Sequence, residues 1–209
     1  MPEIRMLPRR SDAIRQAAST LDRAFFDDPL FAYLLPNPAQ RKRLLSRIHL
    51  IMVRYGLRYG AVYAPPEREG IACWLSPGNT TPTFWRLLAV AWRTPPLALG
   101  VRGYRRYARL NAYLEQTHAR VAPGAHWYLW ALGVDPACQR QGLGSQLLQP
   151  ILAQADRDRG PCYLETMQIT NLAFYERHGF RVVSDGVAPG TALRVWGMRR
   201  GDVAHAPGW

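Results

Sequence analysis

The stretch from residue 126 to residue 148 constrains the fold more than any other part of the chain. Residues 127–134 are uncharged and rich in aromatic and aliphatic side chains, which predicts a strand buried on both faces of a sheet. Asp135 and Pro136 end this strand, because proline disfavours the helical conformation in the residue before it. A loop with two glycines then runs into a helix whose apolar residues recur at helical spacing: Leu143, Leu147, Leu148, Ile151, Leu152 and Ala155. The stretch therefore predicts a buried strand, a glycine loop and an amphipathic helix in direct succession.

The loop between this strand and this helix has the properties of an anion-binding site. The first N–H groups of a helix have no partner within the helix, and the helix dipole places about half a positive charge there. Gly142 and Gly144 carry no Cβ, so a ligand can approach the backbone closely, and Arg140 adds a formal charge. The loop lacks both the Gly-Lys-Ser/Thr of a P-loop and the three spaced glycines of a dinucleotide-binding fold. These features predict a pyrophosphate site of another kind.

Apolar periodicity and turn residues divide the rest of the chain into helices and strands. Helices are expected over residues 11–26, 39–58, 82–94, 99–118 and 170–178. Strands are expected over residues 60–64, 70–75, 162–166, 180–184 and 191–198. Residues 30–35 form a short apolar segment between proline-containing turns. This order predicts a mixed α/β fold, and 209 residues are a typical length for one domain.

The chain carries a formal net charge of +12, which comes almost entirely from arginine. One predicted helix face bears Arg102, Arg105, Arg106 and Arg109, which suits either a nucleic-acid contact or an ordinary solvated surface. No aromatic side chains interleave with these arginines, and no helix-turn-helix or zinc spacing is present, so nucleic-acid binding is not expected. The three scattered cysteines have no metal-ligand spacing, and no metal is expected. The sequence has no apolar run of membrane-spanning length and no signal-peptide core, which predicts a cytoplasmic protein without a membrane partner.

Two motifs in this order resemble the signatures of the GNAT acetyltransferase superfamily. Gln139, Gly142 and Gly144 match the Gln/Arg-x-x-Gly-x-Gly/Ala motif that follows a buried strand. About 30 residues later, the segment from Asn171 through Tyr175 to Phe180 matches the second block of the family, and residues 163–166 resemble its fifth strand. The resemblance covers about residues 126–184, and the segment from 79 to 120 matches by position only.

The resemblance implies a GNAT fold with acetyl-CoA as co-substrate. The expected fold has a central mixed sheet of six to seven strands, flanked by helices, with extra helices between the third and fourth strands. The fourth and fifth strands splay apart to hold the pantetheine arm. One domain is expected over residues 1–209, with a substrate side at about 1–120 and a cofactor side at about 121–200. The residues implied in cofactor binding are Leu132 and Val134 by their backbone, Gln139, Arg140, Gln141, Gly142, Leu143, Gly144, Ser145, Asn171, Phe174 and Tyr175.

The chemistry that the resemblance implies is the attack of an amine on a thioester. Tyr175 lies one helical turn beyond Asn171 and is the expected acid near the leaving sulfur. Glu165 is the expected base, although a purely structural carboxylate at this position is equally compatible with the sequence. His126 and Asp28 are alternative bases, and an acceptor cleft is expected to include Asp28, Tyr33, Trp74 and His126.

The resemblance predicts an N-acetyltransferase that moves an acetyl group to a primary amine, most simply on a small molecule, by direct attack in a ternary complex. A monomer and a homodimer fit the sequence equally. Two other functions remain open on the same fold: a non-catalytic acyl-CoA sensor and a basic nucleic-acid-binding protein. The intact asparagine and tyrosine at positions 171 and 175 favour the enzyme.

Overall fold

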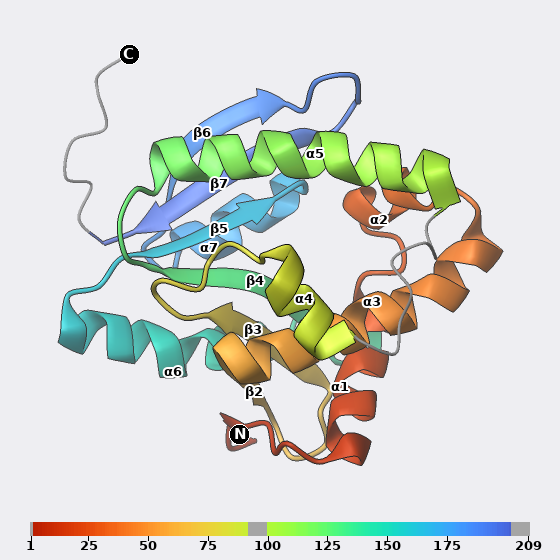
Figure 1. The fold of residues 1–209 in the computed structure, drawn as a ribbon. Coiled ribbons are helices and arrows are strands. Elements are labelled where there is room, and N and C mark those ends of the chain that lie inside the picture. The colour runs from red at the N-terminus through yellow and green to blue at the C-terminus, as the bar shows by residue number, and fades with distance from the viewer. Residues whose placement is uncertain (1, 92–99, 202–209) are drawn as a thin grey trace.

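A seven-stranded mixed sheet forms the centre of the computed structural model, which describes residues 2–91 and 100–201 (Figure 1). The strand order is β1-β2-β3-β4-β5-β7-β6, and only β4 and β5 run parallel to each other. The strands are β1 (Arg5–Met6), β2 (Gly60–Ala64), β3 (Gly70–Leu75), β4 (Trp127–Val134), β5 (Cys162–Thr166), β6 (Arg181–Val187) and β7 (Arg194–Arg200). The mixed sheet and its flanking helices confirm the predicted fold class.

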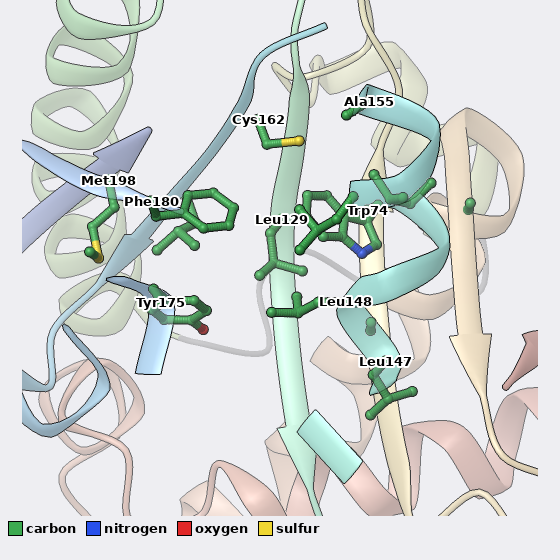
Figure 2. Close-up of a cluster of buried hydrophobic side chains, with 14 of the residues drawn as sticks. Trp74, Leu129, Leu147, Leu148, Ala155, Cys162, Tyr175, Phe180 and Met198 are labelled. Atoms are coloured by element: carbon green, nitrogen blue, oxygen red, sulfur yellow. The ribbon is translucent and has the colours of Figure 1, made fainter. Parts of the chain in front are cut away.

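Helices cover both faces of the sheet (Figure 1). They are α1 (Ser11–Ala24), α2 (Pro29–Leu34), α3 (Pro38–Tyr59), α4 (Phe84–Ala91), α5 (Gly100–Val121), α6 (Leu143–Asp158) and α7 (Leu172–Glu176). The apolar stripe of α6 packs with Trp74 and Leu129 in one buried cluster, which Figure 2 shows. On the opposite face, α1 and α3 pack with Ile71 and Ala131 in a second cluster. Two cores therefore hold the sheet from its two sides.

Two helices near the N-terminus begin at an Asx-Pro pair. Asp28 accepts a hydrogen bond from the backbone N–H of Leu30 at 2.9 Å, and Pro29 occupies the first turn of α2. Asn37 caps α3 in the same way through the N–H of Gln40. An Asx side chain satisfies an N–H that the helix leaves open, and proline is tolerated in the first turn. The apolar segment at residues 30–35 is therefore mostly helix.

A β-bulge in β4 changes which residues face each side of the sheet. Cys73 lies opposite Ala131 and Trp74 lies opposite Leu129, so Trp130 is the extra residue. As a result, Trp127 and Leu129 before the bulge face α6, and so do Leu132 and Val134 after it. The prediction that both faces of β4 are buried is only partly correct, because Tyr128 and Trp130 border a cavity and stay partly exposed.

The parallel strands β4 and β5 pair only over their first residues. Trp127, Tyr128 and Leu129 lie opposite residues 162–164, and β4 then continues to Val134 without further pairing to β5. The expected splay of the fourth and fifth strands is therefore present. On its other edge, β4 pairs with β3 from Tyr128 to Val134, apart from the bulged Trp130.

Most predicted elements agree with the structure to within a few residues, and three differences have a physical cause. The two-residue strand β1 was not predicted, because Arg5 and Met6 are both exposed and show no apolar pattern. The predicted helix at 170–178 is shorter, since residues 169–171 form a 3-10 turn before α7. The last strands begin and end later than predicted, at Arg181–Val187 and Arg194–Arg200. The predicted helical residues 92–94 and 99 lie outside the described residues.

Leu147 of α6 provides a test of the core beneath the glycine loop. Its side chain is fully buried and packs against Gly70 of β3. We expect Leu147→Ala to lower the free energy of unfolding by about 3 kcal/mol, because it leaves a cavity that the sheet cannot fill. Gln149→Ala on the exposed side of the same helix is the matched control, with an expected change within about 0.5 kcal/mol. Urea unfolding measures both, and equal losses would contradict this account of the core.

Candidate active site

A cavity of about 670 Å³ opens between the helices on one side of the sheet. Its walls come from α2, α3, α4, α5 and the ends of β4 and β5. The larger apolar side chains that line it are those of Leu30, Phe31, Leu34, Ile48, Ile51, Met52, Leu87, Leu110, Leu114 and Trp130. The polar side chains that border it include Tyr107, Asn111, Glu115, His118, His126, Tyr128 and Glu165. Cavities of this size and character are typical of small-molecule sites.

Glu165 lies where β4 and β5 separate, one residue beyond the last paired residue of β5. Its side chain is 6% exposed. Tyr128 on β4 donates a hydrogen bond to Oε2 at 2.5 Å, and Tyr163 on β5 donates to Oε1 at 3.1 Å. Burial raises the pKa of Glu165 to about 7, although both phenol hydrogen bonds act in the opposite direction. A carboxyl group with this pKa can accept a proton near neutral pH.

Two histidines form a hydrogen-bonded pair beside Glu165. His118 on α5 and His126 just before β4 approach each other with 2.7 Å between their Nε2 atoms. Nδ1 of His126 lies 2.9 Å from the carbonyl oxygen of Gly124, and Nδ1 of His118 lies 4.0 Å from Oε1 of Glu165. Burial lowers the pKa of His126, and burial together with His126 lowers the pKa of His118 to about 4. Both rings are therefore neutral at pH 7.

Tyr175 is buried on α7, on the opposite side of the sheet from this cavity. Its ring is 8% exposed and contacts Phe174 and Phe180 edge-on, with ring centroids 5.1 and 6.0 Å away. Figure 2 shows Tyr175 and Phe180 across β4 from Leu147. Burial, and to a smaller extent the charge of Asp28, raises the pKa of Tyr175, so the phenol keeps its proton.

The start of α7 is tied to the end of β5. The side-chain amide of Asn171 donates to Oγ1 of Thr166 at 3.2 Å. Thr166 is the last residue of β5, one position after Glu165. This bond places Asn171 and the helix that carries Tyr175 at the end of the splayed strand.

The loop before α6 presents its backbone to solvent. Gln139, Arg140, Gln141 and Gly142 are all exposed. Arg140 and Gly142 have φ values of +61° and +81°, and left-handed residues in such a loop turn successive N–H groups towards one side. The α6 helix begins at Leu143 and is 16 residues long, so its dipole also points at this loop. The arrangement suits a diphosphate, as the sequence indicates.

Neighbouring contacts hold this loop against β4 and α7. The side-chain amide of Gln139 donates to the carbonyl oxygen of Val134 at 3.2 Å. A Cβ on Gly144 would come within 3.3 Å of the Phe174 ring, so a glycine lets the first turn of α6 approach α7 closely. Leu132, Val134 and Phe174 all pack at the edge of the cluster around α6. The structure therefore brings together the residues predicted to bind the cofactor.

The residues predicted to line an acceptor cleft separate into two groups. His126 borders the cavity, as Glu165 does. Trp74 is fully buried and does not line the cavity, because it pairs with Leu129 on the side of the sheet that faces α6. Tyr33 packs in a third apolar cluster, and Asp28 caps α2 and accepts a hydrogen bond from Gln168 at 2.9 Å. Neither of these two residues is among those that line the cavity.

Sequence reasoning missed His118 and Tyr128 as site residues. Tyr128 is hidden within an apolar strand, and only the bulge and the partner strand show that its hydroxyl reaches Glu165. His118 does carry a signal. It continues the helix face that includes Tyr107, Leu110 and Leu114 at spacings of three and four residues, so it shares a face with cavity-lining residues.

Three further properties concern the described part of the chain. Within residues 2–91 and 100–201, no three His, Cys, Asp or Glu side chains gather as a metal site. No helix in the same ranges has both the length and the apolar character that crossing a membrane requires. Cys73 and Cys162 are buried free thiols, and burial raises the pKa of each to about 12.

Comparison with known proteins points to one family. A family model described as the acetyltransferase (GNAT) domain matches residues 103–182. An uncharacterized N-acetyltransferase of Schizosaccharomyces pombe, C550.08, is 31% identical over 172 residues, which cover 79% of this chain and 70% of that protein.

Solved structures with the same fold support this comparison. A Corynebacterium glutamicum protein described as histone acetyltransferase HPA2 and related acetyltransferase has a TM-score of 0.67 at 20% identity, with 99% of this chain and 100% of that chain covered. The polyamine N-acetyltransferase of Drosophila melanogaster has a TM-score of 0.60 at 15% identity, with coverages of 95% and 100%. At these identities the structural likeness concerns the fold.

The raised pKa of Glu165 predicts a pH dependence of stability. The folded protein binds the carboxyl proton of Glu165 more tightly than the unfolded chain does. The protonated carboxyl group therefore contributes fully to the free energy of unfolding below pH 4.5, and this contribution is lost as pH rises through about 7. In the wild type, we expect the free energy of unfolding to fall by an amount on the order of 3 kcal/mol between these pH values because of Glu165. In Glu165→Gln, this fall should be absent. Urea unfolding at pH 4.5, 6 and 8 measures it, with Glu67→Gln in the exposed β2–β3 turn as control. Parallel pH profiles for the wild type and Glu165→Gln would contradict the assignment.

Proposed function

The chain belongs to the GNAT superfamily of N-acetyltransferases, and from this premise we propose that it transfers the acetyl group of acetyl-CoA to the primary amine of a small molecule. The observation that carries the proposal is the position of Glu165. This buried carboxyl group lies at the fork between β4 and β5 and also borders the cavity. At this point, a base can remove a proton from an amine in the cavity as that amine reacts with acetyl-CoA in the fork.

Acetyl-CoA would be held by the loop before α6 and by the open edge of β4. The exposed loop at residues 139–142, the first turn of α6 at residues 143–145 and the charge of Arg140 suit its diphosphate. The backbone of Leu132 and Val134, on the part of β4 that β5 does not pair with, suits its amide-containing arm. Asn171 lies in the turn before α7, and Phe174 and Tyr175 lie in α7; in this proposal all three contact the arm near the thioester.

In the proposed reaction, acetyl-CoA supplies an acetyl thioester, and the side chains of this chain move the protons. Glu165, directly or through a water molecule, removes a proton from the acceptor ammonium group, which has a pKa near 10 in water. The amine nitrogen then forms a bond to the acetyl carbon as the carbon–sulfur bond breaks. Tyr175 gives its proton to the departing sulfur, and its raised pKa keeps that proton available. The new amide nitrogen loses its extra proton, which returns Tyr175 to its neutral form, and Glu165 releases to water the proton that it took.

The cavity supports a small-molecule acceptor. It is enclosed by helices on several sides, and its volume of about 670 Å³ falls in the usual range for ligands of drug size. Residues 30–130 form nearly all of its wall, whereas the loop and α7 lie further along the chain. We therefore assign one domain in which the first part holds the acceptor and the second part holds acetyl-CoA.

The direct test combines binding and turnover. Calorimetry with coenzyme A should show binding to one site per chain. A thiol-release assay with acetyl-CoA over a panel of primary amines should show release that depends on the amine. Binding without turnover on any amine would favour an acyl-CoA sensor, and absence of binding would contradict the proposal as a whole.

Tyr175→Phe tests the role of the phenol hydroxyl. We expect kcat to fall by about 10²-fold or more, since proton donation by a positioned side chain contributes this much. The dissociation constant of coenzyme A should stay within about threefold, because the ring and its packing against Phe174 and Phe180 are retained. Steady-state kinetics and calorimetry measure the two quantities. An unchanged kcat would remove Tyr175 from the mechanism.

A further inference from the structure

We propose, as a refinement that rests on the proposed function, that the acceptor is a monoamine with an apolar body. Its ammonium group is held between Oε1 of Glu165 and Nδ1 of His118. Its apolar body occupies the part of the cavity walled by α2 and α3. The inference rests on the hydrogen-bond roles of the two histidines and on the unequal distribution of polar groups around the cavity.

The hydrogen bonds of the histidine pair determine which nitrogen of His118 is free. The carbonyl oxygen of Gly124 can only accept, so Nδ1 of the neutral His126 carries its hydrogen. Nε2 of His126 is then an acceptor, and the Nε2–H of His118 donates to it over 2.7 Å. In a neutral His118 ring this leaves a lone pair on Nδ1. That lone pair lies on the side of Glu165.

The space between Nδ1 of His118 and Glu165 suits a donor. The two atoms are 4.0 Å apart, which is too long for a direct hydrogen bond, and both are acceptors when the carboxyl group is ionised. An ammonium group has several N–H donors and can bond to both at once. A carboxylate or phosphate ligand would be repelled here. Glu165 is held in place by Tyr128 and Tyr163, and His118 is held by His126, so both acceptors are preorganised.

The rest of the cavity has few acidic side chains that could pair with a second ammonium group. The lining residues from α2 and α3 are all apolar: Leu30, Phe31, Leu34, Ile48, Ile51 and Met52. Apart from Glu165, the acidic side chain among the described lining residues is Glu115, which is exposed on α5 and already accepts a hydrogen bond from Asn111 at 2.8 Å. A second ammonium group beside α2 and α3 would lose its water without gaining a partner. An alkyl or aryl body there is stabilised by burial.

Two amines of equal length test this inference on the wild-type protein. Hexylamine and 1,6-diaminohexane differ only in the second ammonium group. We expect kcat/KM in the thiol-release assay to be at least about 10-fold higher for hexylamine, and calorimetry with coenzyme A present should show the same order of affinity. Equal or better use of the diamine would overturn the inference while leaving the proposed function intact. Acetylation of neither amine, with other primary amines of the panel still acetylated, would overturn the inference alone, whereas no turnover on any amine of the panel, with coenzyme A bound, would overturn both.

Two substitutions of His118 test its role as the second acceptor. His118→Leu removes the lone pair, whereas the side-chain oxygen of Asn in His118→Asn can replace Nδ1. We expect KM for hexylamine to rise at least about 10-fold in His118→Leu and less than about threefold in His118→Asn, with the affinity for coenzyme A unchanged in both. Glu67→Gln, which removes a negative charge away from the cavity, is the control, and thermal unfolding checks each fold. An unchanged KM in His118→Leu, or equal losses in both variants, would show that Nδ1 does not hold the ammonium group.

Discussion

The site depends on the unequal pairing of β4 with its two neighbours. On one edge β4 pairs with β3 from Tyr128 to Val134, apart from the bulged Trp130, which fixes the strand in the sheet. On the other edge its pairing with β5 stops at Leu129. Beyond that point the backbone groups on this edge need partners, because buried N–H and C=O groups are costly to leave unpaired. The strand is therefore fixed in position and has a free edge, which is what an extended ligand with amide groups requires.

The bulge at Trp130 gives the two sides of this fork different environments. Before the bulge, Leu129 faces α6 and Tyr128 faces the cavity. After it, Leu132 and Val134 face α6, while Ala131 and Gly133 face α1. A Cβ on Gly133 would lie within 2.9–3.0 Å of Leu21, Ala24 and Phe25, so only glycine lets α1 pack this closely. Within its eight residues, β4 thereby contributes to an apolar core, an edge that β5 leaves unpaired and a polar wall of the cavity.

The sequence predicts the strand, loop and helix from residue 127 to residue 148 far better than it predicts the cavity, for a physical reason. A strand, a glycine loop and a helix N-terminus are contiguous, so the residues from 127 to 148 carry both the local structure and its chemistry. The cavity is made by segments distant along the chain, and the contact between His118 and Glu165 spans 47 positions that no local pattern connects. Trp74 is a second example of a position that local sequence pattern does not determine. Its strand was predicted correctly, but the face it occupies follows from its pairing with β4 around the bulge.

In the buried polar cluster at the fork, burial and hydrogen bonding shift the pKa of Glu165 in opposite directions. Removal from water favours the neutral forms of Glu165 and both histidines, whereas the hydroxyls of Tyr128 and Tyr163 favour the ionised carboxylate. Burial outweighs the two hydroxyls and raises the pKa of Glu165 to about 7, so the carboxyl group titrates near neutral pH. Neutral histidines add no competing positive charge beside it. A group with this pKa can take a proton from a ligand in the cavity and release it again. The pairing of Glu165 with Gly197 of β7 holds its backbone beside the point where β4 and β5 separate.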